Sequence, residues 1–246
     1  MKPFIYITVA FLGIVSSINA QYNHKWITNR DGLSNNSINC ILEDSMHNLW
    51  IGTWNGVNVY DGRNVVTWNY DKSDPNSVSN NIIYDIVEED SMHMWVIAKN
   101  GLNRWNRQTG HFSYYTPGVD LKKSTPSFDV YTATVLPNST VIVLYRDNCL
   151  FRFNKESEDF EVIDGFPSNA KQILAVKSHH KFYLINYAGE LWSYDLPDNI
   201  NGEIDTKSAK LVYSSHVQSM QFSGQHFIVN FGDHIRIYDP TANTNE

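Results

Sequence analysis

The sequence has little charge, few cysteines and no basic region. Charged residues make up 18% of the 246 residues, and 26 acidic against 19 basic side chains give a formal net charge of -7. Without a basic footprint, no nucleic-acid partner is expected, and polyanions are poor candidate ligands. Two cysteines exclude a small disulfide-stapled module.

The two cysteines, Cys40 and Cys149, fall at non-equivalent places of the repeat described below. We therefore expect two separate, buried thiols and no disulfide. Histidines at ligand spacing do not accompany them, so no metal site is predicted there. No cofactor is expected.

Long hydrophobic runs are absent beyond the N-terminus. Residues 1–20 combine Lys2, an apolar run from Phe4 to Val15 and a small-residue exit at Ala20, as in a secretory signal. The alternative, an uncleaved anchor, is less favoured because the run is shorter than the roughly 20 residues that span a bilayer. We predict cleavage after Ala20 and export of residues 21–246, with no membrane span in the mature chain.

The composition favours an all-β fold. Aromatic residues reach 13%, with 7 Trp, 14 Tyr and 12 Phe, and hydrophobic residues reach 42%. Asparagine is frequent as well, and this combination of sheet-forming and turn-forming residues is typical of antiparallel sheets.

A repeat of about 45 residues runs through the chain. The octapeptide at 44–51, DSMHNLWI, returns as DSMHMWV at 90–96, and GVNVY at 56–60 returns as GLNRW at 101–105. An aromatic residue followed by Asn or Asp recurs in steps of 45, 48, 41 and 44 residues, at Tyr60, Trp105, Phe153, Tyr194 and Tyr238. An aliphatic residue stands three positions before each aromatic: Val57, Leu102, Leu150, Leu191 and Ile235.

Turn signals divide the first repeat into four strands, at 37–43, 49–54, 57–60 and 64–68. A four-stranded sheet with two apolar faces needs a neighbour on each side, which a radial arrangement provides. The fold class predicted is an all-β β-propeller of four-stranded antiparallel blades. The repeats span approximately 31–70, 78–117, 128–165, 170–214 and 217–246, so about five blades are present.

The residues DGLSNNSI at 31–38, LWIGT at 49–53 and NGVNVYD at 55–61 resemble the two-component regulator propeller repeat. This resemblance implies the periplasmic sensor region of a hybrid two-component system histidine kinase that detects carbohydrate-breakdown products. The family's membrane span, kinase and DNA-binding regulator have no counterpart here. The chain is expected to be a periplasmic ligand-sensing propeller and no enzyme.

Two interpretations of the length remain open. Favoured is the N-terminal part of a larger propeller, an incomplete arc that leaves apolar blade faces bare. The alternative is a closed five-bladed ring, in which residues 24–28 supply the outer strand of the last repeat.

Ligands of propellers usually bind on the face formed by the turns between second and third strands and by the connections between blades. Exposed aromatic rings there offer platforms for sugars, and amides and charged groups bind hydroxyls or a carboxylate. The predicted partner is an oligosaccharide or another small glycan, and a homodimer is possible. The predicted ligand-binding residues are Trp54, Lys99, Arg146, Tyr187, Asn36 and Asn81.

Other residues are assigned to structure. We expect Trp50 and Trp95 to pack between blades, Asp44 and Asp90 to cap turns, and Asn35, Asn55, Asn80 and Asn100 to build turns. The pairs Met46-His47 and Met92-His93 could bind copper but fall in different blades, so no metal site is predicted.

Two other functions are alternatives to ligand sensing. A secreted propeller glycosidase or polysaccharide lyase would need two facing carboxylates, for which Asp85 and Asp129 are the candidates, and no motif marks them as acid and base. A protein-protein interaction propeller is the remaining alternative.

Overall fold

The computed structural model describes residues 25–115, 130–145, 149–166, 169–176, 178, 180–196, 204–223 and 226–238. The predicted signal peptide at 1–20, Arg146 and Asp129 lie outside these residues. Apart from a short 3₁₀ turn, η1 (Asn29–Asp31), the regular structure described is β-strand.

The strands form five antiparallel sheets, which we call blades 1 to 5 in chain order. Blade 1 holds β1 (Ile38–Glu43), β2 (Leu49–Thr53), β3 (Gly56–Tyr60) and β4 (Val65–Trp68). Blade 2 holds β5 (Ile83–Asp90), β6 (His93–Ala98), β7 (Gly101–Asn106) and β8 (Phe112–Tyr115). The four strands predicted for the first repeat are confirmed to within one residue at each end.

The later repeats form the same unit. Blade 3 holds β9 (Val130–Val135), β10 (Val141–Tyr145), β11 (Leu150–Asn154) and β12 (Asp159–Ile163). Blade 4 holds β13 (Ala170–Val176), β14 (Lys181–Asn186), β15 (Leu191–Asp195) and β16 (Asp205–Tyr213). Blade 5 has three strands within the described residues: β17 (Ser219–Ser223), β18 (His226–Asn230) and β19 (Ile235–Tyr238).

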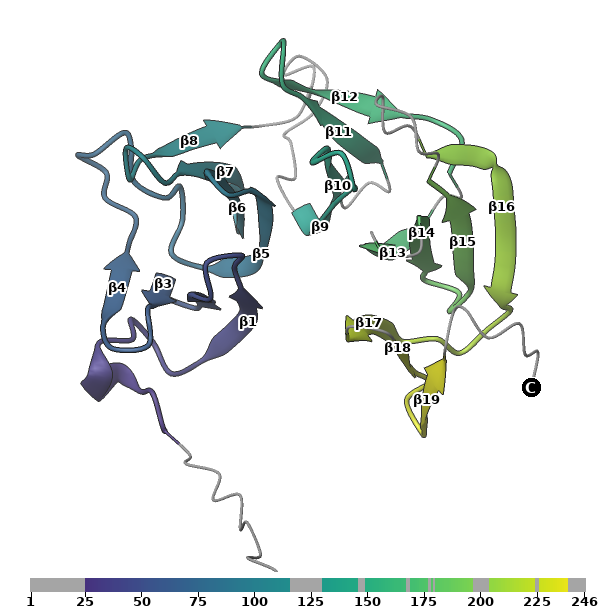
Figure 1. Cartoon of the computed structure of the whole chain (residues 1–246), viewed down its shortest axis with the longest axis horizontal. Coiled ribbons are helices and arrows are strands. Elements are labelled where there is room, and N and C mark those ends of the chain that lie inside the picture. The colour runs from purple at the N-terminus through teal and green to yellow at the C-terminus, as the bar shows by residue number, and fades with distance from the viewer. Residues whose placement is uncertain are drawn as a thin grey trace, which may run out of the picture.

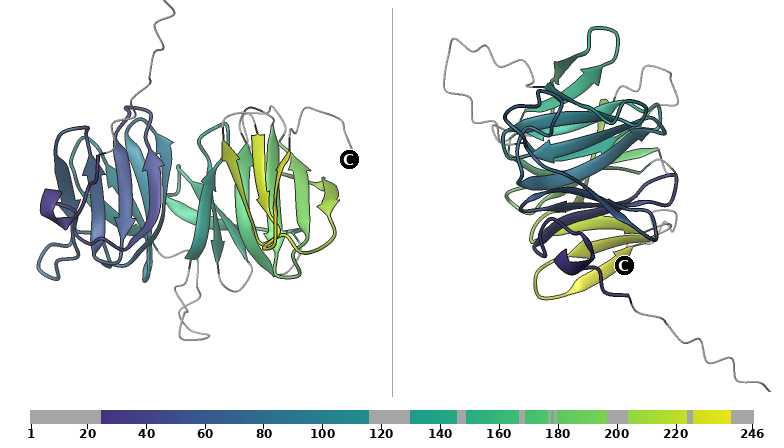
Figure 2. Two further views of the ribbon diagram at one scale, coloured as in Figure 1. Left: turned by 90° about the horizontal axis from the view of Figure 1, so that it is seen from below. Right: turned by 90° about the vertical axis from the view of Figure 1, so that its left-hand side faces the viewer.

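The blades follow one another around a common centre, as in a β-propeller (Figure 1). The first strand of each blade is innermost, and β1, β5, β9, β13 and β17 contact one another in that order. Figure 2 shows the blades standing side by side. The predicted fold class is confirmed.

Each junction between blades has its own apolar core. Trp50, which is fully buried, packs edge to face on Trp105 with ring centroids 4.9 Å apart, between blades 1 and 2. Trp95 packs in the same way on Phe153, at 4.8 Å, between blades 2 and 3. The predicted packing role of Trp50 and Trp95 is confirmed.

The apolar faces at the two ends of the series are uncovered. Ile41 of β1 is 60% exposed, whereas Ile86, its counterpart in β5, is 3% exposed because blade 1 covers it. At the other end Ile235 is 64% exposed, against 0% for its counterpart Leu102. In Figure 1 blades 1 and 5 lie on either side of an opening, which agrees with the predicted arc.

The described residues do not form a closed five-bladed ring, the alternative considered above. Residues 25–28 are not in a strand, and Lys25 Nζ donates a hydrogen bond to the Tyr60 hydroxyl of blade 1, 2.6 Å away. His24 lies outside the described residues. The segment expected to complete blade 5 is thus held by blade 1.

The cysteines form no disulfide with each other, as predicted. Burial raises the pKa of the Cys40 thiol to about 12, and the nearby Asp85 carboxylate adds to the effect. Cys149 is exposed, so the expectation that both thiols are buried is wrong for this one. It directly precedes β11, and its carbonyl oxygen accepts a hydrogen bond from Tyr145 N of β10 at 3.0 Å.

Candidate functional site

The turns between second and third strands take equivalent positions in three blades. The backbone N–H of Trp54 donates to Ser37 O at 3.2 Å, that of Lys99 to Ile82 O at 2.9 Å, and that of Tyr187 to Asn169 O at 2.9 Å. Each acceptor directly precedes the innermost strand of the same blade. The turns and the connections between blades therefore lie on one face, which we call the turn face.

The predicted aromatic residues are exposed on the turn face. Trp54 is 56% exposed and Tyr187 is 57% exposed, although most aromatic side chains among the described residues pack in the cores. Lys99 is exposed as well. These residues come from blades 1, 4 and 2, so the structure places them on one face but on different blades.

The predicted amides hold loops in place. The Asn36 side-chain oxygen accepts a hydrogen bond from Asn29 N at 2.8 Å, and that of Asn81 accepts one from Tyr70 N at 2.6 Å. Asn36 is exposed, and Asn81 is half-buried. Their role as ligand contacts stays a prediction.

The predicted turn-building role of other asparagines is borne out at two positions. The Asn35 side chain accepts a hydrogen bond from Ser37 N at 2.7 Å, and the Asn80 side chain accepts one from Ile82 N at 2.9 Å. In each case an asparagine closes a turn onto the residue two positions on, which fixes the entry to the innermost strand.

A cavity of about 430 Å³ lies between blades 4 and 5, where the sequence predicted no site residue. Its lining residues are Tyr213, Ser215, His216, Phe231, Asp233, His234 and Arg236. Phe231 follows Asn230 at the end of β18 just as Tyr187 follows Asn186 at the end of β14. The repeat register could have identified Phe231 as the fifth member of the turn series.

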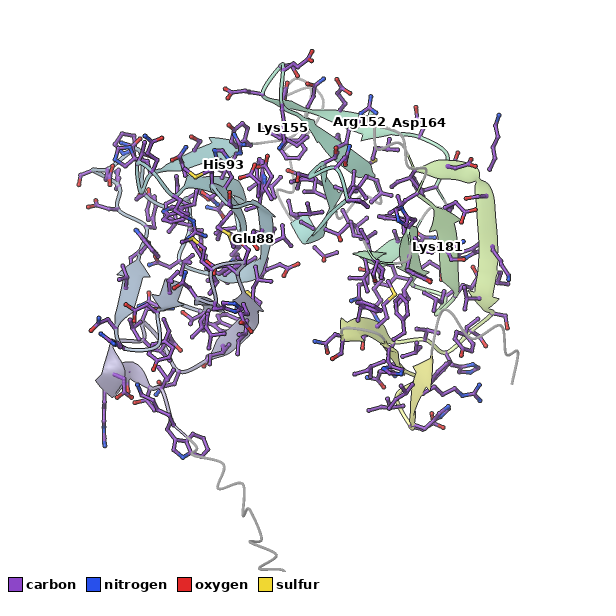
Figure 3. The ribbon with its side chains drawn as sticks, in the orientation of Figure 1. Glu88, His93, Arg152, Lys155, Asp164 and Lys181 are labelled. Atoms are coloured by element: carbon purple, nitrogen blue, oxygen red, sulfur yellow. The ribbon has the colours of Figure 1, made fainter. Side chains whose placement is uncertain are left out.

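A smaller cavity of about 230 Å³ lies between blades 3 and 4 and is lined by Ile142, Arg152, Val162, Ile163, Asp164, Ile204 and Thr206. Arg152 comes from β11 and Asp164 from the end of β12 (Figure 3). Arg152 Nε lies 2.9 Å from Glu161 Oε2, so its charge is already paired within its own blade. The rest of the lining is mainly aliphatic.

One cluster of possible metal ligands exists within the described residues, at Glu89, Asp90 and His93. The buried Glu89 carboxylate lies 2.8 Å from Arg104 Nε and 2.7 Å from Lys155 Nζ. Figure 3 shows Lys155 near His93, where blades 2 and 3 meet. Because both carboxylate oxygens of Glu89 already contact cations, this cluster joins two blades and is a poor metal site.

The predicted turn caps are confirmed, but Asp44 does more than cap. Its Oδ1 accepts hydrogen bonds from Met46 N and Asn48 N, at 2.9 and 2.8 Å. Its Oδ2 accepts one from Trp50 Nε1 at 2.9 Å, which fixes the ring between the blades. Asp90 accepts the corresponding backbone bond from Met92 at 2.9 Å.

Asp85, one of the two acids considered for catalysis, joins two innermost strands. Its Oδ2 accepts hydrogen bonds from Thr132 Oγ1 at 3.1 Å and Ala133 N at 3.4 Å, both in β9. Burial raises the pKa of this carboxyl, and the bond from Ile86 N opposes the rise. These contacts assign Asp85 to the junction of blades 2 and 3. Asp129 lies outside the described residues.

No helix in the described residues is long and apolar enough to cross a membrane.

Comparison with known proteins identifies the repeat. Residues 32–55 match the family described as "Two component regulator propeller". No curated protein matches the chain.

Solved structures share the fold. The extracellular domain assigned to the hybrid two component system BT3049 from B. thetaiotaomicron aligns with a TM-score of 0.68 and 19% identity, over 89% of this chain and 31% of that one. PorZ, a surface component of the type-IX secretion system of Porphyromonas gingivalis, aligns with a TM-score of 0.63 and 12% identity, over 87% of this chain and 27% of that one.

The extracellular domain assigned to the one component system BT4673 from B. thetaiotaomicron aligns with a TM-score of 0.54 and 16% identity, over 84% of this chain and 34% of that one. This chain therefore spans about a third or less of these proteins. At such identities the likeness establishes the fold. The chain is a β-propeller in which residues 32–55, in the first repeat, match the two component regulator propeller family.

Proposed function

We propose that this chain is an exported, periplasmic propeller that binds an oligosaccharide or another small glycan on its turn face and senses it without chemical conversion. The signal-like segment at 1–20 and the extracellular domains among the similar structures support export.

The observation that carries the proposal is the exposure of two aromatic rings at equivalent turns. Trp54 and Tyr187 are more than half exposed on the turn face. Burial of such rings would be favourable by about 2 kcal/mol each, and apolar sugar faces stack on rings of this kind. Binding without conversion is supported by Asp85, whose hydrogen-bonding groups are used between blades.

The test is a thermal-shift screen of the full chain against a panel of neutral and acidic oligosaccharides. A glycan that raises the melting temperature should do so less in Trp54→Ala and Tyr187→Ala, and chromatography should recover it intact. Trp26→Ala is the matched control, because Trp26 is 84% exposed in the segment beside Tyr60, at the other end of β3. It should leave the shift unchanged.

Two results would contradict the proposal. Cleavage of the glycan would make the chain a glycosidase or lyase. Absence of any shift, together with a protein that co-purifies with the chain and depends on Trp54 and Tyr187, would make the turn face a protein-binding surface.

A further inference from the structure

The cavity between blades 4 and 5 opens beside one of the exposed rings. Tyr213 ends β16, Ser215 and His216 belong to the connection that leads to β17, and residues 231–236 form the β18–β19 hairpin. Val217 N donates a hydrogen bond to Gly189 O at 3.0 Å, which ties this connection to the Tyr187 turn. A volume of about 430 Å³ suits a ligand of one or two sugar rings.

Arg236 brings a positive charge to the cavity, and the acidic residue of the lining, Asp233, is paired with His234. Its guanidinium carbon lies 5.4 Å from the centre of the Phe231 ring, a cation–π contact that holds the group without pairing it. Within the described ranges, Arg236 forms no ion pair or hydrogen bond. The guanidinium therefore keeps the N–H donors that bind a carboxylate in bidentate fashion.

Two imidazoles stand beside this guanidinium with one ring nitrogen of each already engaged. His234 stacks on Phe231, with centroids 4.8 Å apart and an interplanar angle of 6°, and its Nδ1 lies 2.7 Å from Asp233 Oδ1. His216 Nδ1 lies 2.7 Å from Ser215 Oγ. In both rings Nε2 is the nitrogen left for a ligand.

One residue of the cavity lining, His216, has an unusual backbone conformation. His216 has a φ of 68°, in the left-handed region that costs a non-glycine residue about 1 kcal/mol. Tyr213 packs edge to face on Phe231, at 5.1 Å, and supplies apolar surface and a hydroxyl. Strain of this kind is found at binding sites, where surrounding contacts hold it in place.

We infer that this cavity binds a sugar that carries a carboxylate. Arg236 receives the carboxylate, and His216, His234 and Tyr213 form hydrogen bonds with the sugar hydroxyls. The chain as a whole has a net charge of -7 and Asp233 lies in the same lining, paired with His234, so the attraction for a carboxylate comes from Arg236. This inference rests on the proposed glycan binding and names its chemical class.

Calorimetric titration of the full chain with D-glucuronate, D-glucose and acetate tests the inference. Glucuronate should bind more tightly than glucose or acetate, and Arg236→Gln should weaken it by about tenfold, the effect of removing one charged hydrogen-bonding partner. Arg63→Gln is the matched control, since Arg63 is exposed on the β3–β4 hairpin of blade 1. It should bind glucuronate as the unaltered chain does.

A second variant guards against an effect on folding. His216→Asn removes the imidazole and keeps a residue that tolerates positive φ, so it should melt normally and still weaken glucuronate. Equal affinity for glucuronate and glucose, equal affinity for glucuronate and acetate, or unchanged binding by Arg236→Gln would overturn the inference. If neutral oligosaccharides still bind in a manner that depends on Trp54 and Tyr187, the proposed function survives that failure.

Discussion

Arg107 of blade 2 binds Asp44 of blade 1, with 3.0 Å between Nη2 and Oδ2, although 63 residues separate them in the chain. One blade further on, Lys155 Nζ lies 2.7 Å from Oε1 of Glu89. In both junctions a cation that follows the third strand of one blade reaches a buried carboxylate of the preceding blade.

The next junction uses the same two positions with apolar residues. Leu196 N donates to His180 O just as Arg107 N donates to Met92 O, so Leu196 takes the place of the cation. Leu136 takes the place of the carboxylate, and it lies with Leu196 in one apolar cluster. At the junction of blades 3 and 4, an apolar contact thus takes the place that an ion pair has in the two preceding junctions.

Arg107→Ala should lower the free energy of unfolding by about 2 kcal/mol, because it leaves the buried Asp44 carboxylate without its charged partner. Urea denaturation measures the change. Arg63→Ala, at an exposed hairpin, should change it by less than about 0.5 kcal/mol. Equal stability of the two variants would show that the ion pair contributes nothing to the junction.

The Asp44 carboxyl predicts an acid dependence of stability. Burial opposes its ionisation, but hydrogen bonds from Trp50, Asn48 and Arg107 outweigh that effect and lower the pKa from 3.8 to about 2. The pKa of Asp44 is lower in the folded state than in the unfolded state, so the ionised carboxylate stabilises the fold. This stabilisation is complete above the pKa of the unfolded state and is lost as the pH falls from about 4 to about 2. Unfolding free energies across this range should fall less steeply for Asp44→Asn. An unchanged slope would contradict the assignment.

Because one face of blade 1 is uncovered, replacing isoleucine by alanine should change the free energy of unfolding by different amounts at Ile41 and at Ile86. Ile86→Ala should cost about 2 to 4 kcal/mol of unfolding free energy, because Ile86 is packed between blades 1 and 2. Ile41→Ala should cost less than about 1 kcal/mol, because Ile41 is 60% exposed. A large loss at Ile41 would indicate that another surface covers it in solution, which analytical ultracentrifugation would detect as self-association.

A buried asparagine in β7, the third strand of blade 2, binds two backbone groups, and its replacement should lower the stability of the fold. Asn103 is fully buried, and its side chain accepts a hydrogen bond from Ser79 N at 2.8 Å and donates one to Val96 O at 3.2 Å. Asn103→Leu should lower the unfolding free energy by about 2 to 3 kcal/mol, since both backbone groups lose a partner. Asn76→Leu, in the exposed loop between β4 and β5, serves as the control in the same denaturation series. Similar losses in the two variants would refute this role.

Much of each blade could be predicted from the sequence because its causes are local. The Asn55-Gly56 turn, with Gly56 at a φ of 119°, separates two short apolar runs and so defines a hairpin. Asp44 was expected to cap its turn because an Asp side chain reaches backbone groups two to four residues on. The periodic return of such signals was sufficient to predict blades.

The candidate site was less predictable. Trp54, Lys99 and Tyr187 could be placed on one face because the repeat puts them in register, and their role as ligand contacts stays a prediction. The same register applies to Phe231, but its importance comes from His216 and Arg236, which another connection and another strand bring beside it. Neither residue belongs to a motif, and no spacing along the chain marks them as neighbours.

The sequence by itself determined the strands, the turns and the stacking unit, since each depends on hydrogen bonds and side-chain alternation within about 45 residues. Only the tertiary structure decided which residues share a junction or a cavity. Ile41 and Ile86 have the same residue type and the same place in their strands, yet only Ile86 is buried. The difference depends on whether a preceding blade covers the residue, and that contact is made by a distant part of the chain.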